Sequence, residues 1–385
     1  MTHAPVTPKT ILHLNTETGW RGGEAQTLRL AQGLRARGHR CLVVGPRQGE
    51  LLNRAAAAGL TVIPLQARGE FDLRAAHLLS RILRDERVDV LHAHTAHAVT
   101  LGTLATLFRR RRPSLVAARR LSFPLRSALF GRVKYGFRVD RVIAVSEAIR
   151  RLLVRQGLDP DRVVAVHSGI DPERFRHGDR LRFRESLRPL LGDETDGAFL
   201  VGAVGHLAAH KGLDIFLSAA AQVARELPAA RFLLIGRGEA EGTLRRAVES
   251  LGLAPRVVFP GFRDDIPDVF AGLDLFVLSS VSGEGSPAVL KEAMASGTPL
   301  VATALEGLDE IVQDARHGLL VPPGNAPALA RAIVVLAEDP QLRARYSAAA
   351  LKRVMEFTAD SMVEKTENIY GSIGQPAREG FAGPI

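Results

Sequence analysis

Two glutamates eight positions apart stand out because their surroundings could hold a phosphorylated sugar. Glu284 lies in a turn rich in glycine and serine, and Glu292 lies in a helix that we expect from Pro287 to Ser296. Ser286 is a favoured residue just before a helix, and Pro287 is a favoured first helical residue. Free N–H groups and the dipole at such a helix start favour an anion such as a diphosphate. The two carboxylates could then reach one cleft from different heights, one meeting a sugar and the other a ribose.

Basic and glycine-rich positions elsewhere could bind the same anion. Lys211 precedes a helix expected from Leu213 to Glu226, and a cation there would stabilise a departing diphosphate. An exposed surface lysine is the alternative interpretation. Gly22 and Gly23 open the first expected helix, where glycine lets backbone N–H groups approach a phosphate or an acceptor closely.

A pair of arginines, Arg119 and Arg120, follows the strand expected at Leu115–Ala118. Guanidinium groups at the carboxyl end of a strand suit a phosphate or an acidic sugar, so we expect this pair to bind the acceptor of a transfer reaction. The alternative is that both arginines belong only to a basic surface.

Three histidines, His92, His94 and His97, stand close enough together to raise the question of a zinc site. No carboxylate occurs at ligand spacing, so we expect His92 to point into a sheet and His97 onto a helix. Asp159-Pro160-Asp161 has the spacing of a metal-binding motif but is typical of a turn. We therefore expect no metal ion.

Short apolar runs alternate with amphipathic, helix-length stretches through almost the whole chain. One series begins with a strand at Thr10–Leu14, and a second begins with a strand at Phe199–Val204. Repeated strand–helix units predict parallel sheets covered by helices on both faces. We expect an α/β protein of two doubly wound, Rossmann-like domains, 1–178 and 179–357, that face a central cleft.

The segment between the two series has mixed charge and two prolines, and we expect it to be a linker over 171–197. A helix near 358–374 is expected to pack back onto the first domain. The remaining residues, 375–385, are expected to form a flexible tail without chemistry.

The composition is that of an ordinary globular protein. A length of 385 residues suits two domains, and 46% hydrophobic with 24% charged residues excludes a fibrous or disordered chain. The only cysteine, Cys41, excludes an internal disulfide. The apolar runs are strand-sized, and residues 1–9 lack the pattern of a signal peptide, so we expect a cytoplasmic location.

The formal net charge of +10 is concentrated in one segment, because residues 109–141 hold eleven arginines or lysines and a single acid, Asp140. This cluster favours a polyanionic partner such as anionic lipid headgroups, a phosphorylated glycolipid or nucleic acid. Only 5% of the residues are aromatic and no base-stacking platform is visible, so we expect no nucleic acid. A solvated basic surface is the alternative.

Several motifs resemble those of glycosyltransferase family 4, the large retaining family with the GT-B fold. Glu284-Gly-Ser-Pro and Glu292-Ala-Met-Ala-Ser-Gly-Thr-Pro match its paired-glutamate signature. The similarity covers nearly the whole chain and continues in the stretches Gly205–Gly212, Leu234–Gly238, Phe259–Phe262 and Gly318–Gly324.

The resemblance implies a role for each matching residue. Glu284, His94 and Lys211 would be the catalytic residues, with Glu284 near the reacting centre of the donor sugar and Lys211 on the diphosphate. Glu292 would bind the ribose hydroxyls. The other expected donor ligands are Gly22, Gly23, His206, Gly236, Phe262, Arg263, Gly285, Ser286 and Pro287.

His206 departs from the family pattern, which usually has arginine at that place. A neutral histidine supplies one hydrogen bond and less charge, so Lys211 would carry more of the diphosphate binding.

The same resemblance implies transfer from a UDP- or GDP-sugar, with retention, to a cell-envelope glycolipid, lipopolysaccharide or polysaccharide acceptor of a bacterium. The nucleotide sugar would be a co-substrate, and we expect no cofactor. Together with the basic segment 109–141, the resemblance implies that the enzyme acts at the inner face of the cell membrane.

Two alternatives remain open at this point. One is a nucleotide-sugar epimerase or hydrolase of the same fold, against which the paired glutamates argue. The other is a non-catalytic membrane-surface protein, which His206 favours and which the set Lys211, Glu284 and Glu292 disfavours.

Overall fold

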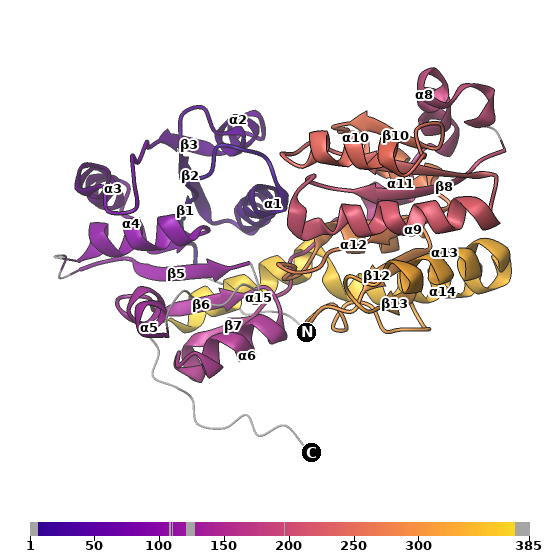
Figure 1. Cartoon of the computed structure of the whole chain (residues 1–385). Helices are drawn as coiled ribbons and strands as arrows, with labels where there is room; N and C mark the ends of the chain where they lie inside the picture. Colours follow the sequence, from indigo (N-terminus) through magenta and orange to yellow (C-terminus); the bar gives the residue numbers. More distant parts are fainter. Residues whose placement is uncertain (1–6, 108, 110, 121–127, 196, 374–385) are drawn as a thin grey trace, which may run out of the picture.

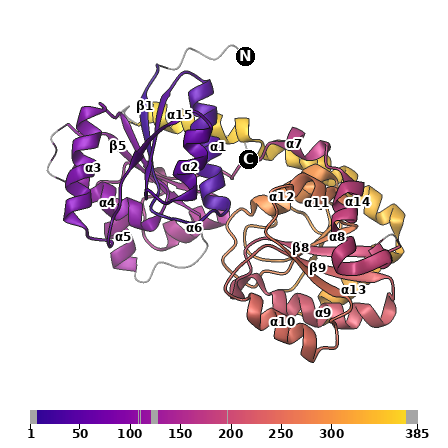
Figure 2. The same cartoon turned by 90° about the horizontal axis from the view of Figure 1, so that it is seen from above.

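The computed structural model of the protein describes residues 7–107, 109, 111–120, 128–195 and 197–373. These residues form two α/β domains that lie side by side (Figure 1, Figure 2). The expected tail, 375–385, lies outside them. Among the described helices, none combines the length and the apolar character needed to cross a bilayer.

The first domain is built on a seven-stranded sheet whose pairings are all parallel. In spatial order the strands are β3 (Thr61–Pro64), β2 (Arg40–Gly45), β1 (Thr10–Leu14), β4 (Val90–Ala93), β5 (Ser114–Arg119), β6 (Arg141–Ala144) and β7 (Val163–Ala165). The helices are α1 (Gly22–Ala36), α2 (Glu50–Ala57), α3 (Leu73–Asp85), α4 (Ala96–Thr106), α5 (Ala128–Gly136), α6 (Glu147–Arg155) and the short η1 (Pro160–Arg162). The strand order reverses between β1 and β4, which is where open α/β sheets bind ligands.

The second domain repeats this plan on a six-stranded parallel sheet. In spatial order its strands are β10 (Val257–Gly261), β9 (Ala230–Ile235), β8 (Phe199–Val204), β11 (Leu275–Leu278), β12 (Leu300–Thr303) and β13 (Leu319–Val321). Its helices include η3 (Ala209–Lys211), α9 (Leu213–Glu226), α10 (Glu241–Ser250), α11 (Ile266–Gly272), α12 (Ala288–Ser296), α13 (Ala326–Glu338), α14 (Pro340–Arg353) and η4 (Val354–Phe357). The expected pair of doubly wound domains is confirmed.

Each sheet is covered on both faces, so alternate strand residues enter different cores. In β1, Leu12 and Leu14 pack against α3 and α4, whereas Ile11 packs on the opposite face with α1 and α2. All three side chains are fully buried. This packing fixes the carboxyl ends of β1 and β4, where the histidines of the site lie.

The expected linker is instead helical and packed. Residues 171–197 contain α7 (Pro172–Arg176), α8 (Arg180–Leu191) and η2 (Gly192–Thr195). Phe175, Phe183 and Leu187 are buried in a core of the second domain. The domain border therefore lies near residue 170 rather than 178. Most charged side chains of the segment are exposed, but Arg184 is buried and pairs with Asp274 over 2.6 Å.

The last described helix, α15 (Ala359–Ser372), returns to the first domain and packs on α1 (Figure 1, Figure 2). Glu367 accepts hydrogen bonds from Arg37 Nη1 (3.0 Å) and pairs with His39 Nε2 (2.8 Å). The Tyr370 hydroxyl lies 2.6 Å from His92 Nδ1. Two chain segments therefore cross between the domains, and they touch each other at Ile170 and Ala359.

Candidate active site between the two domains

Two of the expected catalytic side chains meet directly. Lys211, at the end of η3, donates from Nζ to Oε1 of Glu284 over 2.6 Å. Ser280 donates to the same oxygen over 2.6 Å, and the Lys211 carbonyl accepts from Ser279 Oγ (2.9 Å). Glu284 is 7% exposed, so its charge depends on these partners. A small pocket of about 20 Å³ adjoins the pair and is lined by residues that include Gly205, His206, Lys211, Ser279 and Ser280.

The turn that precedes α12 differs from the expectation in its cap. The helix begins at Ala288, Pro287 occupies the cap position, and no side chain caps the helix. The Ser286 hydroxyl instead accepts from Lys291 Nζ (2.6 Å) and lies 3.3 Å from His167 Nδ1. The buried ammonium group of Lys291 thus uses the Ser286 hydroxyl that could otherwise cap the helix. Because no side chain satisfies them, the backbone donors of this helix start can serve an anion.

Gly285 lies directly against the first domain. A Cβ atom on Gly285 would be 2.2 Å from the Arg120 carbonyl oxygen and 2.8 Å from side-chain atoms of both Val145 and Ile149. Only glycine permits this approach. The turn therefore forms part of the contact between the domains.

Glu292, the expected ribose ligand, also spans the domains. Its Oε1 lies 3.4 Å from Nη2 of Arg29 on α1. Burial raises the pKa of Glu292, while Arg29 and Arg174 act in the opposite direction. A ribose hydroxyl at this carboxylate would compete with the Arg29 contact.

His94 belongs to a buried row of histidines at the carboxyl ends of β1 and β4. Arg120 donates from Nη2 to His94 Nδ1 (2.8 Å), so the His94 proton is on Nε2, which faces His13 Nδ1 at 3.0 Å. Burial and then the charges of His92 and Arg120 hold the pKa of His94 well below its ordinary value. Burial, with Arg120 second, lowers the pKa of His13 to about 3. These rings are therefore neutral near pH 7.

The structure groups His92 and His94 with His13 rather than with His97. The ring nitrogens of these three lie within 4.8 Å of one another, a spacing that could hold a metal ion. The Arg120 guanidinium, however, occupies Nδ1 of His94 and would repel a dication. His97 Nε2 is buried and has no hydrogen-bond partner within the described part of the chain.

Arg120, which was expected to bind the acceptor, uses its guanidinium group within the first domain, and an acceptor role for it stays a prediction. Besides His94, it donates to the Gly23 carbonyl (2.6 Å) and to Thr27 Oγ1 (3.2 Å). Burial lowers the pKa of Arg120 to about 10, with Glu24 opposing the effect. Arg119 hydrogen-bonds to Tyr135, and its role toward the acceptor stays a prediction.

The loop around Gly22 and Gly23 is held by Glu24. This carboxylate accepts from Asn15 Nδ2 (3.1 Å) and from the Arg21 backbone N–H (3.0 Å). The loop leads from the carboxyl end of β1 into α1. A Cβ atom added to Gly22 would have no neighbour within 4 Å among the described residues.

The remaining expected donor ligands lie around the carboxyl edge of the second sheet. His206 pairs with Glu239 over 2.8 Å. A Cβ atom on Gly236 would lie 1.8 Å from the Gly205 carbonyl oxygen, so this glycine allows two loops to pack. Arg263 makes two contacts to Asp265 (2.7 and 2.5 Å), whereas Phe262 is 45% exposed.

Family models match both halves of the chain. The model described as Glycosyltransferase Family 4 matches residues 20–174, and the one described as Glycosyl transferases group 1 matches residues 198–339. A D-inositol 3-phosphate glycosyltransferase of Mycobacterium leprae is 32% identical, over 84% of this chain and 76% of that protein. This chain belongs to glycosyltransferase family 4. A phosphatidyl-myo-inositol mannosyltransferase of the same organism is 28% identical to this family 4 enzyme, over 91% of this chain and 93% of that one.

Solved structures share the fold of this enzyme. Anabaena HepE in complex with UDP and glucose is 25% identical, with a TM-score of 0.83 over 94% of this chain and 100% of HepE. A glycosyltransferase from Rickettsia africae, 19% identical, has a TM-score of 0.84 over 96% of this chain and 100% of that one, and so shows the fold alone. The expected GT-B fold and the expected transfer of glycosyl groups are confirmed, against the epimerase, hydrolase and non-catalytic alternatives.

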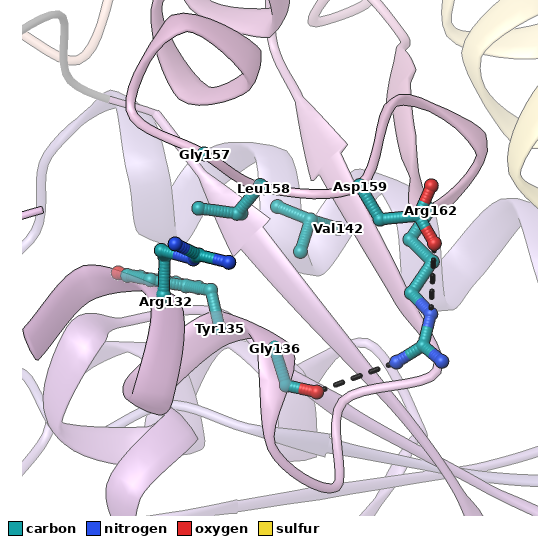
Figure 3. Close-up of a pocket in the computed structure, with 8 residues that line it drawn as sticks. All are labelled: Arg132, Tyr135, Gly136, Val142, Gly157, Leu158, Asp159 and Arg162. Carbon is teal, nitrogen blue, oxygen red and sulfur yellow. Dashed lines mark hydrogen bonds and ion pairs between the residues drawn. The ribbon is translucent and has the colours of Figure 1, made fainter. Parts of the chain in front are cut away.

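A larger cavity of this glycosyltransferase, about 220 Å³, is lined by residues of the first domain (Figure 3). Its floor includes the buried Tyr135, Val142 and Leu158. Arg132 and Arg162 flank it, and Arg162 donates to the Gly136 carbonyl over 3.3 Å. None of the expected site residues lines this cavity.

Proposed function

We propose that this glycosyltransferase transfers a sugar from a nucleoside diphosphate sugar, with retention at the anomeric carbon and without a metal ion. One observation carries the proposal: Lys211 Nζ lies 2.6 Å from Glu284 Oε1, just before the start of α12, which no side chain caps. Lys211 and the helix N–H groups neutralise the leaving diphosphate. Glu284 meets the donor sugar, and Glu292 takes the ribose hydroxyls in exchange for Arg29. His206 contributes through one hydrogen bond once Glu239 releases it.

For the donor we propose a UDP- or GDP-sugar. HepE, whose structure holds UDP and glucose, supports the uridine form, and the related mannosyltransferases show that hexose transfer occurs among similar chains.

A selective rise in melting temperature with one nucleotide class is the expected result of a thermal-shift screen against UDP, GDP, ADP and their common sugar conjugates. The rise is expected to disappear in Lys211→Ala and Glu292→Ala, because each removes a donor contact. Lys352→Ala, an exposed lysine on α14, is the matched control and should respond like wild type. No shift with any nucleotide would contradict the proposed donor.

For the acceptor we propose a cell-envelope glycolipid, or a lipopolysaccharide or polysaccharide precursor, that carries an anionic group. Relatives are named for D-inositol 3-phosphate and phosphatidyl-myo-inositol, both of which are phosphorylated polyols. Arg119 is the last residue of β5, at the carboxyl edge of the first sheet. Its guanidinium suits such a phosphate.

We further propose that the enzyme works in the cytoplasm, on the inner face of the cell membrane, through the basic segment 109–141. On and just after α5, Val133 and Phe137 are 57% and 51% exposed. Arg132 and Arg138 stand beside them, so apolar and cationic side chains share one surface. This mixture is suited to anionic lipid headgroups.

Co-flotation with vesicles tests the membrane proposal. Binding to vesicles of phosphatidylglycerol is expected at low salt, with little binding to phosphatidylcholine and release at high salt because the attraction is electrostatic. Phe137→Ser should weaken binding, whereas Leu251→Ser, 41% exposed on the second domain, should not. Equal, weak binding to both vesicle types would remove the membrane part of the proposal.

A further inference from the structure

A buried lysine that no part of the donor chemistry uses lies inside α12. Lys291 is 0% exposed, and its Nζ donates to the Ser168 carbonyl (2.7 Å), Ser168 Oγ (3.1 Å) and Ser286 Oγ (2.6 Å). These three acceptors satisfy all three ammonium donors. The Phe357 ring lies 5.0 Å from Nζ. Burial lowers the pKa of Lys291 to about 7, with Glu292 and Glu310 opposing the effect.

The partners of Lys291 join two segments that are far apart in sequence. Ser286 lies in the turn before α12, and Ser168 lies in the crossover between the domains. The Ser168 hydroxyl accepts from Lys291 and donates to the Ser286 carbonyl over 2.6 Å. The turn is thus fixed to the crossover through both its side chain and its backbone.

The contacts continue from Ser286 into the first domain. Its hydroxyl lies 3.3 Å from His167 Nδ1, and His167 Nε2 lies 3.1 Å from Glu310 Oε2. Glu310 accepts from the backbone N–H groups of Glu147 and Ala148, each over 2.8 Å, at the start of α6. Burial acts to raise the pKa of Glu310, but His167 and the two backbone donors outweigh it, and the net change is downward.

We propose that Lys291 and Glu310 are positioning residues that couple the docking of the two domains to the shape of the donor turn. Ser286 and His167 connect Lys291 to Glu310, and these four residues are called the Lys291 network below. Because of these contacts, the turn at 285–287 holds its conformation only while α6 is bound to Glu310. The inference rests on the proposed function, in which this turn receives the donor diphosphate. An apolar side chain would fill the Lys291 site without the cost of desolvating an ammonium group, so packing alone does not account for this lysine.

The test uses the full chain and the nucleotide sugar that shifts the wild-type melting temperature. Lys291→Met keeps the length of the stem and removes the ammonium group. Its donor KM is expected to rise about tenfold or more, the usual effect of losing hydrogen bonds to a charged group, with kcat changed far less. Glu310→Ala should raise the donor KM in the same way. Lys352→Met is the control and should match wild type.

The double variant decides whether the two residues act together. If one network joins them, Lys291→Met with Glu310→Ala raises the donor KM no more than the stronger single change does. Independent roles would instead multiply the two effects and overturn the coupling. Wild-type donor KM in Lys291→Met would overturn the positioning role. Should that variant fail to fold, Ser168→Ala, which removes the hydroxyl that accepts from Lys291 and donates to the Ser286 carbonyl, decides by the same KM criterion.

Failure of the proposed function has a different signature. A wild-type chain that binds none of the nucleotides and transfers from no nucleotide sugar would overturn the proposed function and the inference with it. An active wild type whose Lys291→Met and Ser168→Ala variants both keep the wild-type donor KM would overturn only the inference.

Discussion

Replacing Lys211 by methionine is expected to lower kcat/KM for the nucleotide sugar by about 100-fold or more, the usual effect of removing one donor to a developing negative charge. Lys211 Nζ lies 2.6 Å from Glu284, in position to turn toward a diphosphate when the donor arrives. In Lys211→Met, the departing diphosphate no longer has this cation beside it. Release of nucleoside diphosphate at steady state measures the effect.

A companion substitution separates catalysis from stability. In Lys211→Met the buried Glu284 keeps Ser280 as a donor but loses its ionic partner, so the melting temperature should fall. Adding Glu284→Gln removes the unpaired charge and should restore part of the stability while kcat/KM stays about 100-fold or more below wild type. Activity of Lys211→Met within threefold of wild type would contradict the role of Lys211.

Replacing Gly285 by alanine is expected to cost about 100-fold in kcat/KM, because misplacement of a site by about 1 Å has effects of this size. The new methyl group would lie 2.2 Å from the Arg120 carbonyl oxygen, which is backbone and cannot turn aside. The collision is between the domains rather than within one. Each domain should therefore keep its fold, and the far-ultraviolet circular dichroism should stay unchanged.

Small-angle scattering gives the structural measurement for this variant. Gly285→Ala is expected to have a larger radius of gyration than wild type, since the domains must separate to admit the methyl group. Gly371→Ala is the matched control, because a Cβ atom there meets nothing within 4 Å. Wild-type activity together with an unchanged radius would show that the contact between the domains is dispensable.

The strands and the order of the domains could be predicted because a parallel sheet buried on both faces requires continuous apolar runs. Thr10–Leu14 and Phe199–Val204 are strands with the expected bounds. The helices of 171–197 could not be recognised in the same way. There, Phe183 and Leu187 are four residues apart in a highly charged stretch, and their burial depends on packing against distant elements such as α11.

The paired glutamates and Lys211 could be found from local motifs, but their partners could not. Ser286 follows the rule for a helix cap, yet Lys291 five residues later takes its hydroxyl. His13 escaped notice because only the pairing of β1 with β4 brings it beside His92. The sequence predicts that Arg120 binds the acceptor, and only the folded loop shows that Gly23 and Thr27 accept hydrogen bonds from its guanidinium group.

The return of α15 to the first domain affects how the chain is made. Its Tyr370 and Val363 complete a core that begins with Ile11 of β1, and Tyr370 contacts His92 beside the site. On the ribosome, the first domain therefore lacks one of its helices until residues 359–372 have been synthesised, by which time the second domain already has all of its described strands. An attempt to produce the first domain alone should join residues 7–170 directly to 359–373, which is possible because Ile170 and Ala359 are hydrogen-bonded neighbours.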